Sequence, residues 1–214
     1  MKRLLPTLLT LSFSLVLFSC SAQSKKKALD TKISINPPAG TAIAAFAEGC
    51  FWCSEHIFEA VVGIDSAVSG YAGGTIPNPT YELVNTETTG HAESILVYYD
   101  PQVISYQELA KVFFTSHDPT TKDQQGPDRG NSYRSIIFYK TGEEKGFAEQ
   151  AKKDFAKSFK NPIVSEIKEL KEFYKAEGYH QNYIEHNPYS SYVQGVSIPR
   201  FELFKRTYKG KLKH

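Results

Sequence analysis

Two cysteines three positions apart are the residues of this chain with the most evident chemistry. Cys50 and Cys53 stand in the segment EGCFWCS, and their spacer holds Phe51 and Trp52, the only tryptophan among 214 residues. Thiols at this spacing can bind a metal, close a structural disulfide or exchange electrons reversibly. The rest of the sequence has to distinguish these three uses.

A reversible redox pair fits the sequence better than the other two uses. Structural zinc takes four ligands, and the spacing of His180 and His186 does not suit the second half of such a site. We therefore expect no metal. A structural bridge between Cys50 and Cys53 would close a very short loop, and the stabilisation from a disulfide grows with the length of the loop.

The predicted elements place the pair at the start of a helix. The apolar run 41–47 predicts a buried strand, and the apolar residues of 50–62 lie on one face of a helix. The unpaired N–H groups and the dipole at a helix start favour a thiolate on Cys50, and Cys53, one turn on, can reach it. This geometry suits a thioredoxin-like dithiol, and equally an enzyme whose second cysteine resolves an oxidised first one.

Alternating strands and helices over the rest of the chain predict an α+β domain. Capping boxes at 105–108 and 141–144 begin two further helices. Further strands are expected at 64–71, 94–99 and 134–139, with an edge strand at 163–167. The order βαβ–βαβ predicts a two-layer, ferredoxin-like (split βαβ) mixed sheet with helices on one face. A long irregular segment follows from about residue 169.

The N-terminal segment is typical of an exported protein. Basic Lys2-Arg3 precede an apolar stretch, 8–18, that is too short to span a membrane. Leu17-Phe18-Ser19-Cys20 resembles the lipobox of bacterial lipoproteins, which implies a lipid on Cys20; simple cleavage after Ala22 is the alternative. We expect a signal peptide over 1–19, a lipidated Cys20 with a flexible tether over 20–40, and one domain over 41–214. The location is then the bacterial cell envelope, with the lipid as the only contact with the membrane.

The composition excludes some other classes of protein. Hydrophobic residues make up 41% and charged residues 22% of the chain, which argues against wholesale disorder. The net charge of +2 comes partly from lysines near both ends. Without a nucleic-acid motif or interleaved aromatics, such lysines indicate solvated ends, and we expect no nucleic-acid partner.

A series of short motifs runs through the chain in a fixed order. Its members are Gly49-Cys50-Phe51-Trp52, Gly70-Tyr71-Ala72-Gly73-Gly74, Asn78-Pro79-Thr80-Tyr81, Thr89-Gly90-His91-Ala92-Glu93, Tyr99-Asp100-Pro101, His117-Asp118-Pro119-Thr120, Gln125-Gly126-Pro127-Asp128, Tyr133-Arg134-Ser135, His180-Gln181-Asn182-Tyr183 and Asn187-Pro188-Tyr189. The series resembles the A-type peptide methionine sulfoxide reductases over about residues 41–208. One tetrapeptide alone would be weak evidence for the family, but this many motifs in the order of the family are specific to it.

The resemblance implies that the domain reduces the S epimer of methionine sulfoxide, free or in proteins. Cys50 would attack the sulfoxide sulfur while Glu93 protonates the oxygen, which leaves a sulfenic acid on Cys50. A carboxyl can act so at neutral pH only if burial raises its pKa. Cys53 would then form a disulfide with Cys50, and thioredoxin or a thioredoxin-like donor would reduce it. No cofactor is implied.

The resemblance also assigns the residues that hold the substrate. Tyr81 and Tyr133 match two phenols that hydrogen-bond the sulfoxide oxygen. Phe51 and Trp52 match the apolar wall around the methyl group, and Asp128 matches a residue that helps to orient the substrate.

The chain departs from the family pattern at four positions. Many members have glycine after Phe-Trp and resolving cysteines in a C-terminal tail, whereas this chain has Cys53 and no later cysteine, so local resolution is implied. Glu87 stands where glycine is common, Gln124 where arginine is common and Ser132 where glutamine is common.

Two other functions stay open on the sequence alone. One is a general extracytoplasmic thiol–disulfide oxidoreductase, and the other is a tethered binding lipoprotein with an incidental disulfide. Neither needs an acid, so replacing Glu93 would discriminate them from a reductase of sulfoxides. We expect the protein to be a monomer.

Overall fold

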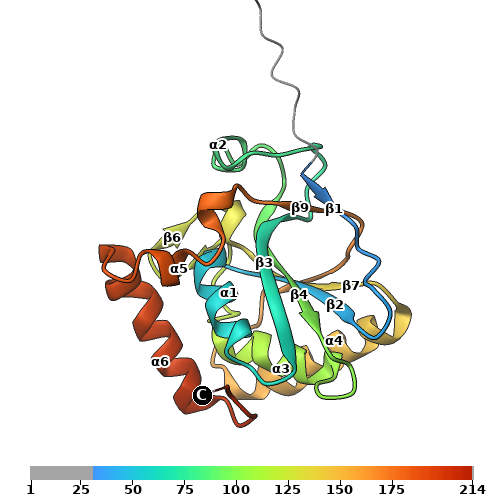
Figure 1. The fold of residues 1–214 in the computed structure, drawn as a ribbon. Coiled ribbons are helices and arrows are strands. Elements are labelled where there is room, and N and C mark those ends of the chain that lie inside the picture. Colours follow the sequence, from blue (N-terminus) through green and yellow to red (C-terminus); the bar gives the residue numbers. More distant parts are fainter. Residues whose placement is uncertain (1–30, 214) are drawn as a thin grey trace, which may run out of the picture.

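Seven strands within residues 31–213, the part of the chain that the computed structural model describes, form one mixed sheet (Figure 1). The strand order is β1-β9-β3-β4-β2-β7-β8. The strands are β1 Lys32–Ile33, β2 Ala42–Glu48, β3 Ile64–Ala72, β4 Ala92–Tyr99, β7 Ser135–Tyr139, β8 Glu166–Glu169 and β9 Phe173–Lys175. A separate small hairpin consists of β5 Gln124–Gln125 and β6 Asp128–Arg129.

Six α-helices lie between or after these strands along the described part of the chain. They are α1 Phe51–Glu59, α2 Tyr81–Val84, α3 Tyr106–Ser116, α4 Gly142–Phe155, α5 Tyr183–His186 and α6 Ile198–Thr207. The N-caps of both predicted helices are confirmed, because the Ser105 and Thr141 hydroxyls accept hydrogen bonds from the backbone N–H groups of Glu108 and Glu144.

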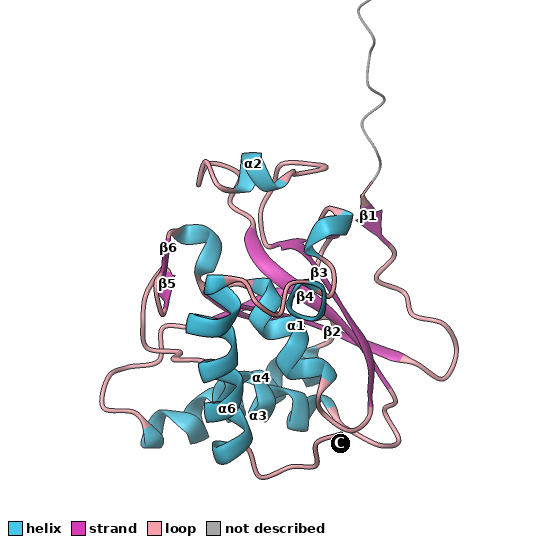
Figure 2. Cartoon of the chain, turned by 60° about the vertical axis from the view of Figure 1, so that its left-hand side comes forward, coloured by secondary structure: helices cyan, strands magenta, loops and turns pink. Residues whose placement is uncertain are grey.

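The central strands confirm the predicted fold class. β2 pairs antiparallel with β4 and β7, and β3 pairs antiparallel with β4, so the central order is β3-β4-β2-β7. With α1 between β2 and β3, and α3 between β4 and β7, this is the split βαβ arrangement. Figure 2 shows the long helices gathered on one face of the sheet.

The residues of β2 alternate between two apolar layers. Ala44 and Phe46 point into the core that the helices cover, whereas Ala45 and Ala47 point to the opposite face. That second face is covered by Ile33, Ile35, Leu170 and Phe173, among others. Because both faces are covered, β2 reads as a continuous apolar run rather than an alternating one.

The segment that enters the domain is partly held against the sheet. Within the range 20–40 that the sequence predicts as a tether, Lys32–Ile33 pairs with β9, and Lys140 Nζ donates to the Ile35 carbonyl at 2.7 Å. The predicted signal peptide and Cys20 lie outside the described residues. No helix in the described part of the chain is both long and apolar enough to cross a membrane.

The C-terminal part is more regular than the sequence predicts. Residues 198–207 form α6, which packs against α1 and α3. The basic run after residue 204 is not a free tail, since Leu212 bridges to Val61 and Lys213 Nζ donates to the Ile64 carbonyl. The edge strand expected at 163–167 lies instead at Glu166–Glu169, where β8 runs parallel to β7.

Candidate active site

The two cysteines lie where β2 turns into α1. Cys50 is the N-cap residue of α1, and Cys53 lies in its first turn. Gly49 makes the turn with a φ of +93°, and a Cβ there would approach Gln125 Cβ to 2.5 Å, so only glycine fits. Both side chains are reduced thiols and both are buried, with 5% exposure for Cys50 and 1% for Cys53.

A cavity of about 360 Å³ opens beside Cys50. Seven of the eight predicted site residues that the structure describes line it, and only Cys53 does not. The lining residues are Cys50, Phe51, Trp52, Tyr81, Glu93, Asp128, Tyr133, Tyr183, Ser190, Ser191 and Tyr192. Side chains more than 80 positions apart in the sequence therefore meet around one thiol.

Glu93 is the buried acid of this cavity. It lies on β4 with 2% of its surface exposed, and its Oε2 accepts the backbone N–H of Phe51 at 3.0 Å. Burial raises the pKa of Glu93 to about 8, against the lowering effect of that hydrogen bond. The carboxyl is thus mostly protonated at neutral pH, and it can donate a proton beside the Cys50 sulfur.

Two phenols complete the polar side of the cavity. Tyr81 begins α2, and its backbone N–H donates to Glu177 Oε1 at 2.9 Å. Tyr133 ends the short helical turn Asn131–Tyr133, and this turn is held by Glu87, which accepts from the N–H and the hydroxyl of Ser132 at 2.9 and 2.7 Å. Burial raises the pKa of both phenols, so they stay protonated and can donate hydrogen bonds.

Trp52 forms the apolar wall together with a residue that the sequence did not mark as functional. Its ring stacks on Tyr183 with centroids 3.6 Å apart and planes 7° apart, and its Nε1–H donates to His180 Nδ1 at 3.1 Å. Phe51 is buried beside it. The motif His180-Gln181-Asn182-Tyr183 was part of the resemblance, and it was the signal that could have assigned Tyr183 to the site.

Asp128 is held by a second residue that sequence reasoning missed. The Tyr192 hydroxyl donates to Asp128 Oδ2 at 2.5 Å. Burial raises the pKa of Asp128, while this hydrogen bond and Arg200 act in the opposite direction. Tyr192 lies in the C-terminal segment for which the sequence predicts only irregular structure, and it lines the cavity.

The charge of the thiol pair differs from what the helix start predicts. Burial raises the pKa of Cys50, and its coupling to Cys53 raises it further. The hydrogen bond from Cys50 and the charge of Arg200 together lower the pKa of Cys53 to about 6, against the raising effect of burial. The first N–H of α1 is taken by the Glu93 carboxyl. In the free site Cys53 therefore ionises more easily than Cys50.

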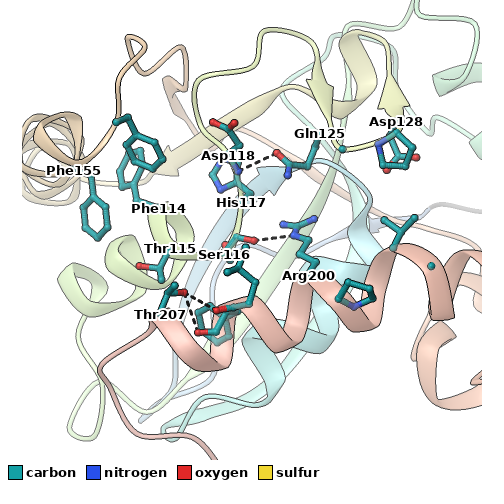
Figure 3. A pocket seen from close by; sticks show the side chains of 18 of the residues that line it. Phe114, Thr115, Ser116, His117, Asp118, Gln125, Asp128, Phe155, Arg200 and Thr207 are labelled. Carbon is teal, nitrogen blue, oxygen red and sulfur yellow. Dashed lines mark hydrogen bonds between the residues drawn. The ribbon is translucent and has the colours of Figure 1, made fainter.

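A second cavity, of about 750 Å³, lies between α3, α4 and α6 (Figure 3). It shares Asp128 and Tyr192 with the first. Figure 3 shows Arg200 extending from α6 toward Ser116, whose carbonyl accepts from Arg200 Nε at 2.8 Å. Arg200 Nη2 also pairs with Glu48 Oε1 at 2.7 Å.

The histidines of the loop motifs are structural anchors. His91 accepts the Gly74 N–H at 3.2 Å, and its other ring nitrogen lies 2.8 Å from the Ile76 carbonyl oxygen. His117 is buried, and burial lowers its pKa to about 3, so it is neutral beside Glu48. Among residues 31–213 no group of three or more His, Cys, Asp or Glu side chains is placed to hold a metal ion.

Comparisons with known proteins agree with this geometry. The family model described as peptide methionine sulfoxide reductase matches residues 42–212. A peptide methionine sulfoxide reductase MsrA 1 from Rhodopirellula baltica is 41% identical over 181 residues, covering 85% of this chain and 94% of the relative.

Solved structures agree as well. The reduced form of Mxr1 from Saccharomyces cerevisiae superposes with a TM-score of 0.69 at 34% identity, covering 75% of this chain and 92% of Mxr1. The same yeast protein in complex with Trx2 gives a TM-score of 0.50 at 28% identity, covering 69% of this chain and 87% of that one. The chain therefore belongs to the peptide methionine sulfoxide reductase family, as an oxidoreductase of the MsrA type.

Proposed function

We propose that this reductase acts on the S epimer of methionine sulfoxide, free or in proteins, through a sulfenic acid on Cys50. The observation that carries the proposal is the buried Glu93 carboxyl with a pKa of about 8, lining the same cavity as Cys50. A thiol alone exchanges disulfides without an acid, whereas removal of a sulfoxide oxygen needs a proton delivered to that oxygen.

The residues of the cavity divide the first step between them. The sulfoxide oxygen accepts hydrogen bonds from Tyr81 and Tyr133, and the methyl group rests on Trp52. Cys50 gives its proton to the hydrogen-bonded Cys53 and attacks the sulfur as a thiolate, while Glu93 passes its proton to the oxygen. The bond between the substrate sulfur and the oxygen then breaks as the hydroxyl transfers to the Cys50 sulfur, which becomes a sulfenic acid, and methionine leaves with its sulfur lone pair restored.

Cys53 resolves the sulfenic acid in the second step. Its thiolate attacks the Cys50 sulfur, the hydroxyl leaves as water after gaining a proton, and a Cys50–Cys53 disulfide forms. A thioredoxin-like dithiol then supplies two electrons and two protons to restore the thiols, without a cofactor in this protein. The yeast relative solved with Trx2 supports this choice of donor.

The proposal includes a place in the cell. Residues 1–19 act as the signal peptide, Cys20 carries the lipid, and the catalytic domain works as a monomer in the bacterial envelope. The lipobox-like sequence Leu17-Phe18-Ser19-Cys20 supports this. Mass spectrometry of the mature N-terminus tests it, because simple cleavage after Ala22 leaves no lipid.

An assay with separated epimers tests the reaction. The purified protein is given free and peptide-bound S-sulfoxide or R-sulfoxide with a dithiol donor, and methionine is measured. Turnover of the S epimer with little of the R epimer is expected. Equal rates on both would contradict the proposed selectivity, and disulfide exchange without turnover of either would favour the general oxidoreductase.

A further inference from the structure

Cys53 has a partner that the first cysteine lacks. Its Sγ donates a hydrogen bond to Ser197 Oγ at 3.2 Å, and Ser197 has 1% of its surface exposed. Ser197 belongs to the turn that leads into α6. Cys50 lines the catalytic cavity, and Cys53 does not. The two sulfurs therefore differ in access as well as in neighbours.

Arg200, whose side chain is 11% exposed, places a positive charge near the two cysteines. It follows Ser197 by one turn of the chain, and its Nη1 would lie 3.7 Å from a Cβ placed on Gly49, next to the cysteines. Its partner Glu48 is fully buried, and burial raises the pKa of Glu48 to about 7. The carboxyl thus cancels the guanidinium charge only in part near neutral pH, and Arg200 lowers the pKa of Cys53.

We propose that Ser197 and Arg200 make Cys53 the leaving sulfur of the Cys50–Cys53 disulfide, so that the external dithiol attacks Cys50. The inference rests on the proposed disulfide and deepens it by giving the exchange a direction. Thiol–disulfide exchange depends on which sulfur can be reached and on how well the other leaves as a thiolate. Both conditions select the same direction here.

The donor thiolate attacks Cys50 Sγ, a donor–Cys50 disulfide forms, and the Cys50–Cys53 bond breaks. The electron pair leaves on Cys53 Sγ, where the Ser197 hydroxyl can turn to donate to the thiolate and the Arg200 charge lies nearby. The second donor thiol then attacks the donor's own sulfur, Cys50 leaves as a thiolate that takes up a proton, and the donor is oxidised.

Trapping the mixed disulfide tests the direction. The protein is oxidised with diamide and mixed with a thioredoxin whose second active-site cysteine is serine. The reaction is quenched in acid at several early times, free thiols are alkylated, and peptides are analysed by mass spectrometry. We expect thioredoxin on Cys50 and the alkyl group on Cys53. Thioredoxin on Cys53 at the earliest times would overturn the proposal. Because diamide makes the disulfide, this result does not depend on sulfoxide reduction.

Variants of the C-terminal helix test the cause. Ser197→Ala and Arg200→Gln should slow donor-dependent recycling and raise the pH midpoint of Cys53 alkylation by about one unit or more. Ser197→Thr should restore the midpoint, and Arg200→Lys should restore part of it. Lys205→Gln, which removes an exposed charge from the same helix, is the control and should change neither. A purely structural role would lower the thermal stability and leave the midpoint in place, which would refute the proposal.

Discussion

Replacing Glu93 by glutamine tests the central chemical claim, since it removes the proton and keeps the shape. With a pKa of about 8, about nine-tenths of the Glu93 carboxyls are protonated at pH 7. The amide oxygen can still accept the Phe51 N–H, so the start of α1 should be preserved. General acid catalysis contributes roughly 10²–10⁴ in rate, which corresponds to about 3–5 kcal/mol of the barrier. We expect the rate of the first step to fall by that factor in the variant.

Single-turnover kinetics measure this loss without interference from recycling. The reduced protein is mixed with excess sulfoxide and no donor, and methionine is quantified at successive quench times. Ionisation of Cys50 grows with pH in both proteins, because burial raises the pKa of that thiol, so the informative quantity is the ratio of the natural rate to the variant rate. This ratio should fall about tenfold per pH unit above pH 8, because only the natural protein loses the carboxyl proton there.

Glu55→Gln is the matched control. Glu55 is also a buried carboxyl, and burial raises its pKa to about 7, but it accepts from Ser69 and Asn182 and does not line the catalytic cavity. This variant should keep the single-turnover rate within about twofold. The reasoning is refuted if Glu93→Gln reduces sulfoxide as fast as the natural protein, or if Glu55→Gln slows the step equally.

Three further outcomes are expected. Cys53→Ser should produce one methionine per protein and then stop, with a dimedone-reactive sulfenic acid on Cys50; normal recycling with thioredoxin would show another resolving thiol. Glu87→Gly removes the two hydrogen bonds to Ser132 but relieves a φ of +63°, which costs a residue with a Cβ about 1 kcal/mol. Its stability should therefore change by less than about 2 kcal/mol in chemical denaturation while the KM for sulfoxide rises; an unchanged KM would contradict the role given to that turn. The folded-state pKa of Glu93 is raised above the unfolded value, so its protonation supports folding below about pH 4.5 in full, and this support declines up to about pH 8. Relative to the natural protein, Glu93→Gln should thus gain stability as the pH rises through that window and level off above it, and a constant difference would disprove the raised pKa.

The parts of the site that the sequence predicts are those carried by contiguous motifs. Cys50, Tyr81, Glu93 and Tyr133 each stand in a short motif at a strand end or loop, and the structure brings them to one cavity. The capping boxes and the apolar periods also located α3, α4 and the central strands, because those signals depend on neighbours in the chain.

The parts that the sequence does not predict depend on contacts between distant segments. Ser197 contacts Cys53, and Arg200 contacts Glu48, only because α6 packs against α1 and α3. Gly195 and Pro199 interrupt the helical period there, and the lysines that follow are typical of a solvated end. No local signal in the sequence distinguishes an irregular segment from a helix that places an arginine near a buried thiol.

The short pairing of β1 with β9 sets the length of the tether that would join the domain to the proposed lipid on Cys20. Lys32 is fixed to Tyr174 in the sheet, so only the chain between Cys20 and Lys32 separates the proposed lipid from the folded domain. Twelve residues span at most about 43 Å when fully extended. With the proposed lipid on Cys20, a domain held so close to the bilayer would repair proteins that share its membrane surface, and more distant substrates would have to diffuse to it.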